Sequence, residues 1–350
     1  MTHAIFVIPG DLSLPTGGYA YDRRVLALLP QFGIRVDHLQ LPGSFPAPSA
    51  ADLVETSARL APSAGKAVLL IDGLAYGAMP AAVIRGFGRD PIVALVHHPL
   101  CLEAGLPAAR QAELERLETE ALALATHVIA TSATTARTLT ADFGVPVECI
   151  TVAEPGTDPA PRATGSDGNP VRLLAVGSVV PRKGYDVLIE ALVTLKSLPW
   201  RLDIVGALDR SPDTAREIER RIAANGFGDR ITLHGGVDDA RLARLYDTAD
   251  LFVLASHYEG YGMVLTEAIA RGLAIVCTIG GAAGETVPDG AALKVEPGSP
   301  RALAWTLGRA IDDGQVRTRL ADAAWAAAGQ LPRWEDTARR IAAVIEEVGR

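Results

Sequence analysis

The chain has 350 residues, of which 49% are hydrophobic, so it is too long for one ordinary core and suits two domains of about 150 to 200 residues. A formal net charge of -8 excludes attraction of the whole chain to nucleic acid or to an anionic membrane. A phosphate-bearing ligand therefore needs a local binding site.

The three cysteines, Cys101, Cys149 and Cys277, lie far apart and form no C-x-x-C pair, which argues against a zinc site and against a disulfide framework. The N-terminal MTHAIFVIPG lacks a basic region followed by a long apolar core, and no apolar run reaches the roughly 18 residues of a membrane helix. We therefore expect a cytoplasmic protein with no membrane span and at most a weak peripheral association with membranes.

Short runs rich in Val, Ile and Leu alternate with stretches of helical period in both halves of the chain. The runs cover residues 4–8, 68–71, 92–96 and 127–131, and then 171–177, 201–206, 231–235, 251–256 and 273–277. Fully apolar strands separated by helices indicate a parallel sheet that is covered on both faces. The sequence therefore predicts an α/β protein with two doubly wound, Rossmann-like domains.

The stretch Pro155–Pro170 is rich in Pro, Gly, Ser and Asp and reads as the linker, which gives domains of residues 1–160 and 161–334. Open sheets of this type bind ligands beyond the carboxyl ends of their strands, so two facing domains are expected to form a cleft. No G-x-G-x-x-G follows a predicted strand, which disfavours a dinucleotide oxidoreductase, and the absence of G-x-x-x-x-G-K-[ST] excludes P-loop chemistry.

Arg182 and Lys183 stand where the chain leaves a predicted strand, just before a helix that begins near Gly184. The free N-H groups of that helix and two cations suit a diphosphate, because Arg can bind two oxygens at once and Lys supplies a mobile charge. The alternative is a solvated basic pair on a surface loop.

The stretch SHYEGYGMVLTEAIARG places Glu259 in a glycine-rich turn after a buried strand and Glu267 in the first or second turn of the next helix. Carboxylates bind vicinal hydroxyls, as on a sugar or a ribose, while the amides near Gly262 can face a phosphate. The alternative for each glutamate taken singly is structural. Glu267 would complement the helix dipole, and Glu259 would be a solvated loop residue.

The spacing of Glu259 and Glu267 in EGYGMVLTEA, together with GSVVPRKG and GGAAGE, resembles the signature of the family 4 retaining glycosyltransferases of the GT-B fold. The match is specific from about Val171 to Glu285. In the first half it is looser and rests on Gly17-Gly18, His97-His98, ATS at 130–132 and PGTD at 155–158. The resemblance implies that a C-terminal helix, about residues 335–350, packs back on an N-terminal acceptor domain, and that residues 161–334 bind the nucleotide-sugar donor.

The resemblance also implies roles for individual residues. Arg182 and Lys183 would hold the donor diphosphate, Glu267 the ribose, and Glu259 the hydroxyls of the transferred sugar, while the backbone at 235–237 would lie near the base. The catalytic set implied is His97, His98, Arg182, Lys183 and Glu259, and the donor-binding set is Gly17, Gly18, Gly177, Arg182, Lys183, Val237, Glu259, Gly260, Tyr261, Gly262, Met263, Val264 and Glu267.

Two adjacent histidines, His97 and His98, follow the run IVALV, and the family directs one histidine here at the donor sugar. Successive strand residues point to opposite faces, so we expect at most one of them to reach the cleft and favour His97. The alternative is a structural role for both. Gly17-Gly18 is expected in the loop after the first strand, where glycine allows close approach of a ligand but is also ordinary turn chemistry.

These expectations combine into a retaining, metal-independent glycosyltransferase without a cofactor, whose co-substrate is a nucleotide-diphosphate sugar. Residues 1–160 hold 10 Lys and Arg against 16 Asp and Glu, which argues against a strongly membrane-seeking acceptor domain. The acceptor, whether sugar, lipid or small molecule, stays open, as does the oligomeric state. The alternatives are a GT-B nucleotide-sugar 2-epimerase, a phosphorylase or a catalytically inactive nucleotide-sugar-binding protein.

Overall fold

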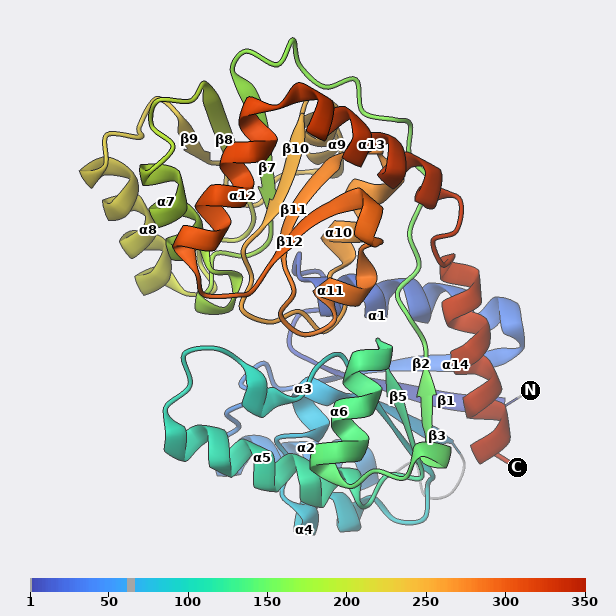
Figure 1. Cartoon of the computed structure of the whole chain (residues 1–350). Coiled ribbons are helices and arrows are strands. Elements are labelled where there is room, and N and C mark those ends of the chain that lie inside the picture. Colours follow the sequence, from blue (N-terminus) through green and yellow to red (C-terminus); the bar gives the residue numbers. More distant parts are fainter. Residues whose placement is uncertain (1, 62–66) are drawn as a thin grey trace. The chain divides into compact units, whose positions relative to one another are not determined.

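A computed structural model describes residues 2–61 and 67–350, and its chain forms two compact units (Figure 1). The first unit contains the chain up to Gly156 together with Pro332–Arg350, and the second contains Thr157–Leu331. The boundary that the sequence predicts, between residues 160 and 161, lies in the same irregular segment as the boundary at 156.

The first unit is built on a six-stranded sheet in the order β2-β1-β3-β4-β5-β6. Every pairing between these neighbours is parallel. The strands are β1 (Thr2–Pro9), β2 (Ile34–Leu41), β3 (Val68–Asp72), β4 (Ile92–Val96), β5 (His127–Ala130) and β6 (Ile150–Val152). All residues of β3 and β4 are buried, and all of them are apolar except Asp72 at the end of β3, as expected for central strands.

The helices of the first unit follow the strands and supply polar caps where the chain turns. They are α1 (Gly17–Leu28), α2 (Ala50–Leu60), α3 (Gly73–Tyr76), α4 (Ala81–Ile84), α5 (Ala108–Leu122), α6 (Ala133–Phe143) and α14 (Trp334–Val348). Thr16, Ser49 and Ser132 cap α1, α2 and α6 by accepting a hydrogen bond from a backbone amide in the first turn.

Helix α14 returns to the first unit at the end of the chain and is fixed there through its first turn. The Trp334 ring lies edge-on to Tyr21 with a centroid distance of 5.8 Å, and Thr337 Oγ1 donates to the carbonyl of Glu154 at 2.6 Å. Gly156 has no room for a side chain, because an added Cβ would lie 2.2 Å from Trp334 N. The last helix is therefore part of the core of the first unit.

The second unit repeats the plan with a parallel sheet in the order β12-β11-β10-β7-β8-β9. Its strands are β7 (Val171–Val176), β8 (Trp200–Val205), β9 (Ile231–Leu233), β10 (Leu251–Leu254), β11 (Ala274–Thr278) and β12 (Ala292–Val295). Its helices are α7 (Tyr185–Val193), α8 (Pro212–Ala224), α9 (Asp239–Asp247), α10 (Met263–Ala270), α11 (Ala283–Thr286), α12 (Pro300–Asp312) and α13 (Gly314–Ala328).

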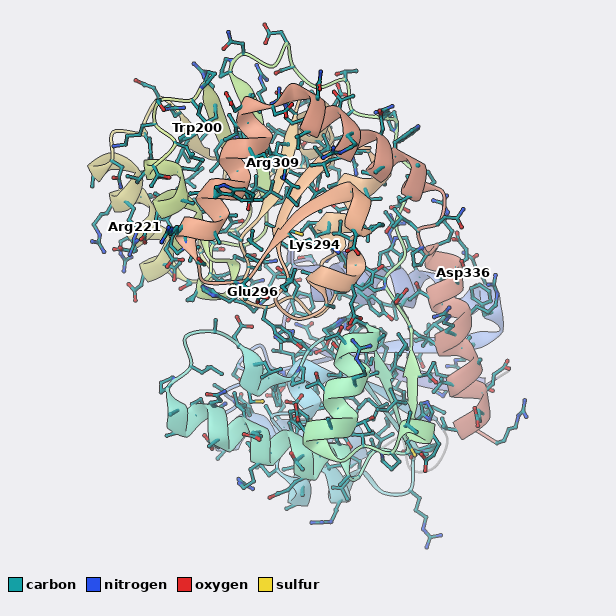
Figure 2. All side chains as sticks on the ribbon, viewed as in Figure 1. Trp200, Arg221, Lys294, Glu296, Arg309 and Asp336 are labelled. Atoms are coloured by element: carbon teal, nitrogen blue, oxygen red, sulfur yellow. The ribbon has the colours of Figure 1, made fainter. Side chains whose placement is uncertain are left out.

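Apolar side chains on the two faces of this second sheet enter separate clusters. Leu173 packs in the cluster that includes α7 and α12, whereas the next residue, Leu174, packs in the cluster that includes α10. Trp200, labelled in Figure 2, is buried below the Arg230 guanidinium, whose Cζ lies 3.8 Å from the ring centroid. A sheet with both faces covered is the doubly wound α/β arrangement that the sequence predicts, and this prediction is confirmed.

Three strands are absent from the sequence prediction: β2, β6 and β12. Each is the last strand at an edge of its sheet. Most of their side chains are partly buried or exposed, and their sequences lack the continuous apolar run that marks the central strands.

Each sheet has one place where the strand order reverses direction. In the first unit this point lies between β1 and β3, and in the second it lies between β7 and β10. Loops that follow adjacent strands diverge there, which leaves room for a ligand beyond the carboxyl ends of the strands. These two switch points are the places at which the fold favours a site.

Candidate functional site

The turn after β7 is held tightly against the loop after β10, at the switch point of the second unit. Residues Pro181–Lys183 form a single 3₁₀ turn, and Gly184 follows with a left-handed φ of 63° before α7 begins. A Cβ on Gly184 would lie 2.2 Å from the carbonyl oxygen of Ala255. Glycine at this position therefore allows the contact that brings the two loops together.

Glu259 lies at the centre of this contact and is 6% exposed. Its Oε1 accepts hydrogen bonds from Lys183 Nζ and from Ser256 Oγ, both at 2.6 Å. Its Oε2 lies 3.4 Å from Arg182 Nη1, which also donates to the carbonyl of Tyr258 at 2.7 Å. The structure thus brings together three of the predicted catalytic residues, Arg182, Lys183 and Glu259, in one ion-paired cluster.

The charge state of Glu259 follows from these partners. Burial by itself raises the pKa of the carboxyl, but the positive charges of Lys183 and Arg182 and the hydrogen bonds from Lys183 and Ser256 lower it to about 2. Glu259 is therefore ionised at neutral pH. Its single negative charge offsets one of the two positive charges of Arg182 and Lys183, so the cluster keeps an excess positive charge.

The backbone around Glu259 is fixed from the next strand. Glu259 N donates to the carbonyl of Gly280 at 3.1 Å, and Ala282 N donates to the carbonyl of Glu259 at 2.8 Å. Gly262 then adopts a φ of 94° as the N-cap of α10 and supplies no capping side chain, so the first amides of the helix are available to an anion. The turn between Glu259 and α10 consists of Gly260, Tyr261 and Gly262. Met263 and Val264 are the first two residues of α10.

Glu267 lies in the second turn of α10, as predicted. Tyr246 Oη donates to its Oε2 at 2.9 Å, and the Arg271 guanidinium, which donates to the Glu267 carbonyl, lies over the Tyr246 ring at 4.4 Å. Burial raises the pKa of the Glu267 carboxyl, and the Tyr246 hydrogen bond only partly offsets this rise. One carboxylate oxygen, Oε2, is therefore held by Tyr246.

Two further predicted donor residues flank this site. Gly177 directly follows β7, and a Cβ there would lie 3.0 Å from Lys183 Cε, so a side chain would displace the lysine. Val237 follows β9 and is packed, half-buried, against the apolar cluster that contains Phe252.

The first unit holds a second group of polar residues at its own switch point. His97 Nε2 lies 3.3 Å from Asp22 Oδ1 and 3.4 Å from Asp72 Oδ2. Asp22 comes from α1 and Asp72 ends β3, and both carboxylates are buried. The Tyr21 ring lies edge-on to the His97 ring with a centroid distance of 5.2 Å. Gly18 lies beside the same ring, since an added Cβ there would be 3.4 Å from His97 Cδ2.

His98 points to different partners, since its Nε2 lies 3.2 Å from Glu103 Oε2. The two histidines therefore diverge, as the alternation of side chains predicts. The prediction that Gly17 and Gly18 lie in the loop after the first strand is wrong. They are the first two residues of α1, because the Thr16 hydroxyl accepts a hydrogen bond from Tyr19 N and caps the helix directly before Gly17.

The buried carboxylates change the protonation of this group. Burial alone lowers the pKa of His97, but the hydrogen bonds and charges of Asp22 and Asp72 raise it to about 10. Burial and the charge of Asp72 raise the pKa of Asp22 to about 7. The ligand atoms of the three residues lie within 4.8 Å of one another, so among the described residues they also form a group that could hold a metal ion.

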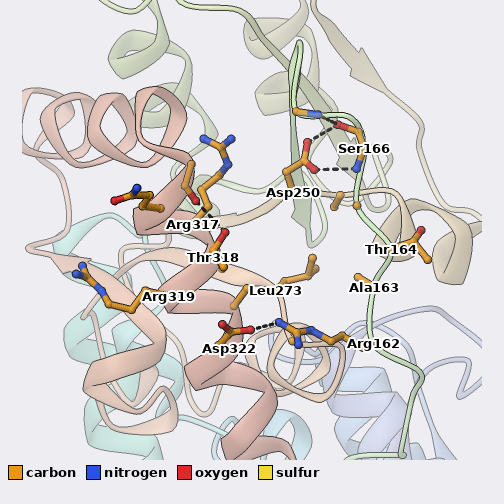
Figure 3. A pocket seen from close by; sticks show the side chains of 18 of the residues that line it. Arg162, Ala163, Thr164, Ser166, Asp250, Leu273, Arg317, Thr318, Arg319 and Asp322 are labelled. Atoms are coloured by element: carbon orange, nitrogen blue, oxygen red, sulfur yellow. Dashed lines mark hydrogen bonds and ion pairs between the residues drawn. The ribbon is translucent and has the colours of Figure 1, made fainter.

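A groove of about 1190 Å³ lies elsewhere on the second unit and contains none of the predicted site residues. It is bordered by the linker segment 162–168, by residues that precede β10 and β11, and by the junction of α12 and α13 (Figure 3). Asp250 holds the linker through Ser166, and Arg317 donates to the carbonyls of Ala310 and Ile311. The groove lies at the amino ends of the strands, the end opposite to that at which such sheets bind ligands.

Sequence reasoning missed four residues that complete these two groups: Asp22, Asp72, Ser256 and Tyr246. Asp72 and Ser256 carry the signal that could have found them, because each is a polar residue directly after an apolar run that ends a central strand. Asp22 and Tyr246 lie within helices, where nothing in the local sequence distinguishes a buried polar side chain from a surface one.

The sequence matches two family models, one in each half of the chain. Residues 157–326 match glycosyl transferases group 1, and residues 68–161 match Glycosyltransferase Family 4. The chain belongs to the family 4 glycosyltransferases. The resemblance predicted from EGYGMVLTEA and GSVVPRKG is confirmed.

Curated relatives of this family 4 chain include a D-inositol 3-phosphate glycosyltransferase from Xylanimonas cellulosilytica, 32% identical over 63% of this chain and 57% of the relative. An MMP alpha-(1->4)-mannosyltransferase from Mycolicibacterium hassiacum is 30% identical over 73% of this chain and 65% of the relative. The matched region thus spans between about half and two thirds of the length of these relatives.

Solved structures extend the likeness to almost the whole chain. Sucrose-phosphate synthase from Thermosynechococcus elongatus superposes with a TM-score of 0.83 at 19% identity, covering 99% of each chain. Anabaena HepE in complex with UDP and glucose gives 0.77 at 22% identity, covering 99% of this chain and 100% of HepE. At this identity the likeness shows the fold, which is GT-B.

Over residues 2–61 and 67–350, no helix combines the length and the apolar character that crossing a bilayer requires.

Proposed function

We propose that this family 4 member is a retaining glycosyltransferase that moves a hexosyl group from a nucleotide-diphosphate sugar to an acceptor without a metal ion. The observation that supports it most directly is the convergence of Arg182, Lys183 and Glu259 at the switch point between β7 and β10. Two cations and a carboxylate at this position match a ligand that carries both a diphosphate and sugar hydroxyls.

The ion pairs of Glu259 suggest how the donor enters. The donor diphosphate is a stronger anion than one carboxylate, so it takes over Lys183 and Arg182 as ligands. Glu259 then has an oxygen free to accept a hydroxyl of the transferred sugar. Both cations come to rest on the leaving phosphate, where they neutralise the charge that develops as the glycosidic bond breaks and thereby supply what a metal ion supplies in other enzymes.

The nucleotide lies along α10 in this proposal. Glu267 Oε1 accepts from a ribose hydroxyl while Tyr246 keeps Oε2 in place, and the uncapped amides of Met263 and Val264 face the phosphate. The complex of HepE with UDP and glucose supports a nucleotide-diphosphate donor for a protein of this fold. His97 of the first unit is the group that we assign to the transferred sugar.

The proposal is tested by transfer reactions with UDP-, GDP- and ADP-sugars and a panel of sugar, polyol phosphate and lipid-linked acceptors, in the presence of EDTA. NMR spectroscopy of the product should show the anomeric configuration of the donor. Arg182→Ala and Lys183→Ala should each lower turnover by about 100-fold or more. Arg216→Ala, which removes an exposed surface arginine of the same unit, is the control and should leave turnover unchanged.

Product analysis also separates the alternatives. A 2-epimerase leaves the nucleotide attached to the altered sugar, and a phosphorylase requires inorganic phosphate. Donor binding without nucleotide release from any acceptor indicates a binding protein without catalysis. Transfer that is abolished by EDTA and restored by a divalent cation contradicts the metal-independent mechanism.

A further inference from the structure

Three side chains that can bind a metal ion converge inside the first unit. Asp22 lies on α1, which follows β1, Asp72 ends β3, and His97 directly follows β4. Because β3 lies between β1 and β4 in the sheet, the segments that leave these strands bring the three residues together. Within residues 2–61 and 67–350, no other three side chains of His, Cys, Asp or Glu place their ligand atoms this close to one another.

The carboxylate of Asp22 is buried and lacks hydrogen-bond partners. Asp22 is 0% exposed, and none of the described residues donates a hydrogen bond to either of its oxygens. The same holds for His97 Nε2, which is also buried and faces this carboxylate. Polar atoms in a protein interior are costly unless a partner satisfies them. A fully buried carboxylate directed at an unsatisfied imidazole nitrogen therefore points to a cation that both atoms bind.

The spacing of the three residues suits coordination better than direct hydrogen bonding. His97 Nε2 lies 3.3 Å from Asp22 Oδ1 and 3.4 Å from Asp72 Oδ2. A charge-assisted hydrogen bond from nitrogen to a carboxylate is shorter, at about 2.7 to 2.9 Å. Zinc binds imidazole nitrogen and carboxylate oxygen at about 2.0 to 2.2 Å, so two ligands of a tetrahedral ion lie roughly 3.3 to 3.6 Å apart. The two distances therefore match two edges of a tetrahedral site.

The chemistry of the ligands selects the class of ion. The carboxylates of Asp22 and Asp72 carry two negative charges, which one divalent cation neutralises while the imidazole stays neutral. The hard cations Mg²⁺ and Ca²⁺ prefer oxygen ligands, whereas imidazole suits zinc and its neighbours among the transition metals. Three protein ligands leave the fourth position of a tetrahedral ion to water.

Neighbouring groups fix the ligands from outside. Asp72 Oδ1 accepts a hydrogen bond from Leu74 N at 2.7 Å, which leaves Oδ2 directed at His97. Thr131 Oγ1 donates to the carbonyl of His97 at 3.1 Å and holds the backbone there. The hydroxyl of Tyr21, beside the ring, donates to a backbone carbonyl at 2.9 Å and so does not serve as a ligand. Outer hydrogen bonds of this kind orient the ligands in metal sites.

We propose that Asp22, Asp72 and His97 Nε2 bind one divalent transition-metal ion of the zinc type inside the first unit. The ion neutralises the two carboxylates and links α1 to the ends of β3 and β4, so it stabilises this unit. It is separate from the proposed transfer reaction, in which Arg182 and Lys183 of the second unit hold the diphosphate without a metal. The inference uses only Nε2 of His97 and does not require its assignment to the sugar.

Zinc binding by the full chain tests the proposal without any substrate. The protein is treated with EDTA, freed of the chelator and titrated calorimetrically with ZnCl₂, which should reveal one saturable site per chain. Asp22→Asn, Asp72→Asn and His97→Gln should each weaken the affinity by about 100-fold or more, because loss of even an outer partner of a metal ligand costs about 10- to 100-fold. Millimolar Mg²⁺ should not displace the zinc.

Asp37→Asn is the matched control, because Asp37 and His3 form another pair of carboxylate and imidazole on the surface of the same unit, at 2.8 Å. It should leave zinc affinity and stoichiometry unchanged. Absence of saturable zinc binding overturns the proposal in favour of an ion pair without metal. Zinc binding that Asp37→Asn removes and the three ligand variants keep overturns it as well.

A spectroscopic measurement on the unaltered protein guards against variants that fail to fold. Four-coordinate Co²⁺ absorbs visible light intensely, and six-coordinate Co²⁺ absorbs weakly, so the spectrum reports the geometry of the site. One equivalent of Co²⁺ should give the intense spectrum, and zinc should abolish it. A weak spectrum alone contradicts the tetrahedral site.

Thermal unfolding links the site to stability. Zinc should raise the melting temperature of the unaltered protein and leave that of Asp22→Asn unchanged, because an ion that binds only the folded chain stabilises it. An equal rise in both proteins counts against the site. Since EDTA also removes this ion, the transfer assay in EDTA is run at a temperature at which the metal-free chain stays folded, which keeps the proposed function and the metal site separately testable.

Discussion

In the proposed function, the donor diphosphate competes with Glu259 for Arg182 and Lys183. This competition predicts opposite effects of a Glu259 substitution on the binding of the nucleotide and on turnover of the nucleotide sugar. Glu259→Gln removes the negative charge that is paired with Lys183 and Arg182. The nucleoside diphosphate should therefore bind as tightly as before or more tightly. Turnover with the nucleotide sugar should fall by about 100-fold, because the sugar loses its charged partner.

Calorimetric titration with the nucleoside diphosphate and steady-state kinetics measure the two effects separately. Ser256→Ala is the matched control, because it removes one hydrogen bond to Glu259 and keeps the charge. Weaker binding of the diphosphate in Glu259→Gln is inconsistent with competition for the cations.

The lowered pKa of Glu259 also predicts how stability depends on pH. A carboxyl with a pKa of about 2 when folded and 4.5 when unfolded adds stability that is fully present above about pH 4.5 and is lost as the pH falls toward 2. The difference in unfolding free energy between the unaltered protein and Glu259→Gln should therefore shrink across this window. Urea titrations at pH 7, 4 and 3 measure it, and a difference that is constant with pH contradicts the ion pairs.

At the scale of elements, the close approach of the β7–α7 turn to the β10–α10 loop depends on Gly184. Gly184→Ala combines a left-handed φ of 63° with a 2.2 Å clash against Ala255 O, and should destabilise the second unit by about 2 to 4 kcal/mol. Gly226→Ala is the control, because Gly226 has a similar φ of 69° but open space around it, and should cost about 1 kcal/mol.

Thermal unfolding separates the two variants, since about 2 to 4 °C of melting temperature corresponds to 1 kcal/mol for a unit of this size. Nucleotide affinity should also fall in Gly184→Ala, because Arg182 and Lys183 move with the turn. Equal melting temperatures for the two variants refute a tight contact between the loops.

The elements that sequence reasoning predicted and those that it missed differ in burial. Central strands such as β4 and β10 consist of apolar residues throughout and are recognisable, whereas the edge strand β6 has no fully buried residue and no such signal. The positions of Arg182, Lys183 and Glu259 at strand ends were predictable for the same reason.

Their ion pairing was not predictable, and neither was the contact of Asp22 with His97. Both depend on the strand order, which brings together residues that are 76 and 75 positions apart in the chain. Local sequence does not encode that order. The start of α1 was misplaced because the Thr16 cap outweighed the turn preference of two glycines.

For the whole molecule, the two units have separate cores, and the C-terminal helix belongs to the first. Trp334→Ala removes a buried ring that contacts Tyr21 and should destabilise the first unit by about 3 to 5 kcal/mol. Nucleotide affinity should not change, because the proposed nucleotide site lies in the second unit. Differential scanning calorimetry with and without nucleotide measures both, and Trp305→Ala, at a tryptophan that is 70% exposed, is the control.

The central claim is that the second unit binds a nucleotide-diphosphate sugar through Glu267 and the cation pair. The most direct measurement is calorimetric binding of UDP, GDP, ADP, their sugar conjugates and NAD to the full chain and to Glu267→Ala, with Tyr246→Phe as the variant that removes only the hydroxyl donor to Glu267. The account predicts binding of one nucleotide series, weakened at least tenfold in Glu267→Ala and less in Tyr246→Phe. Binding of NAD alone, of no nucleotide diphosphate, or equal affinity in Glu267→Ala would contradict it.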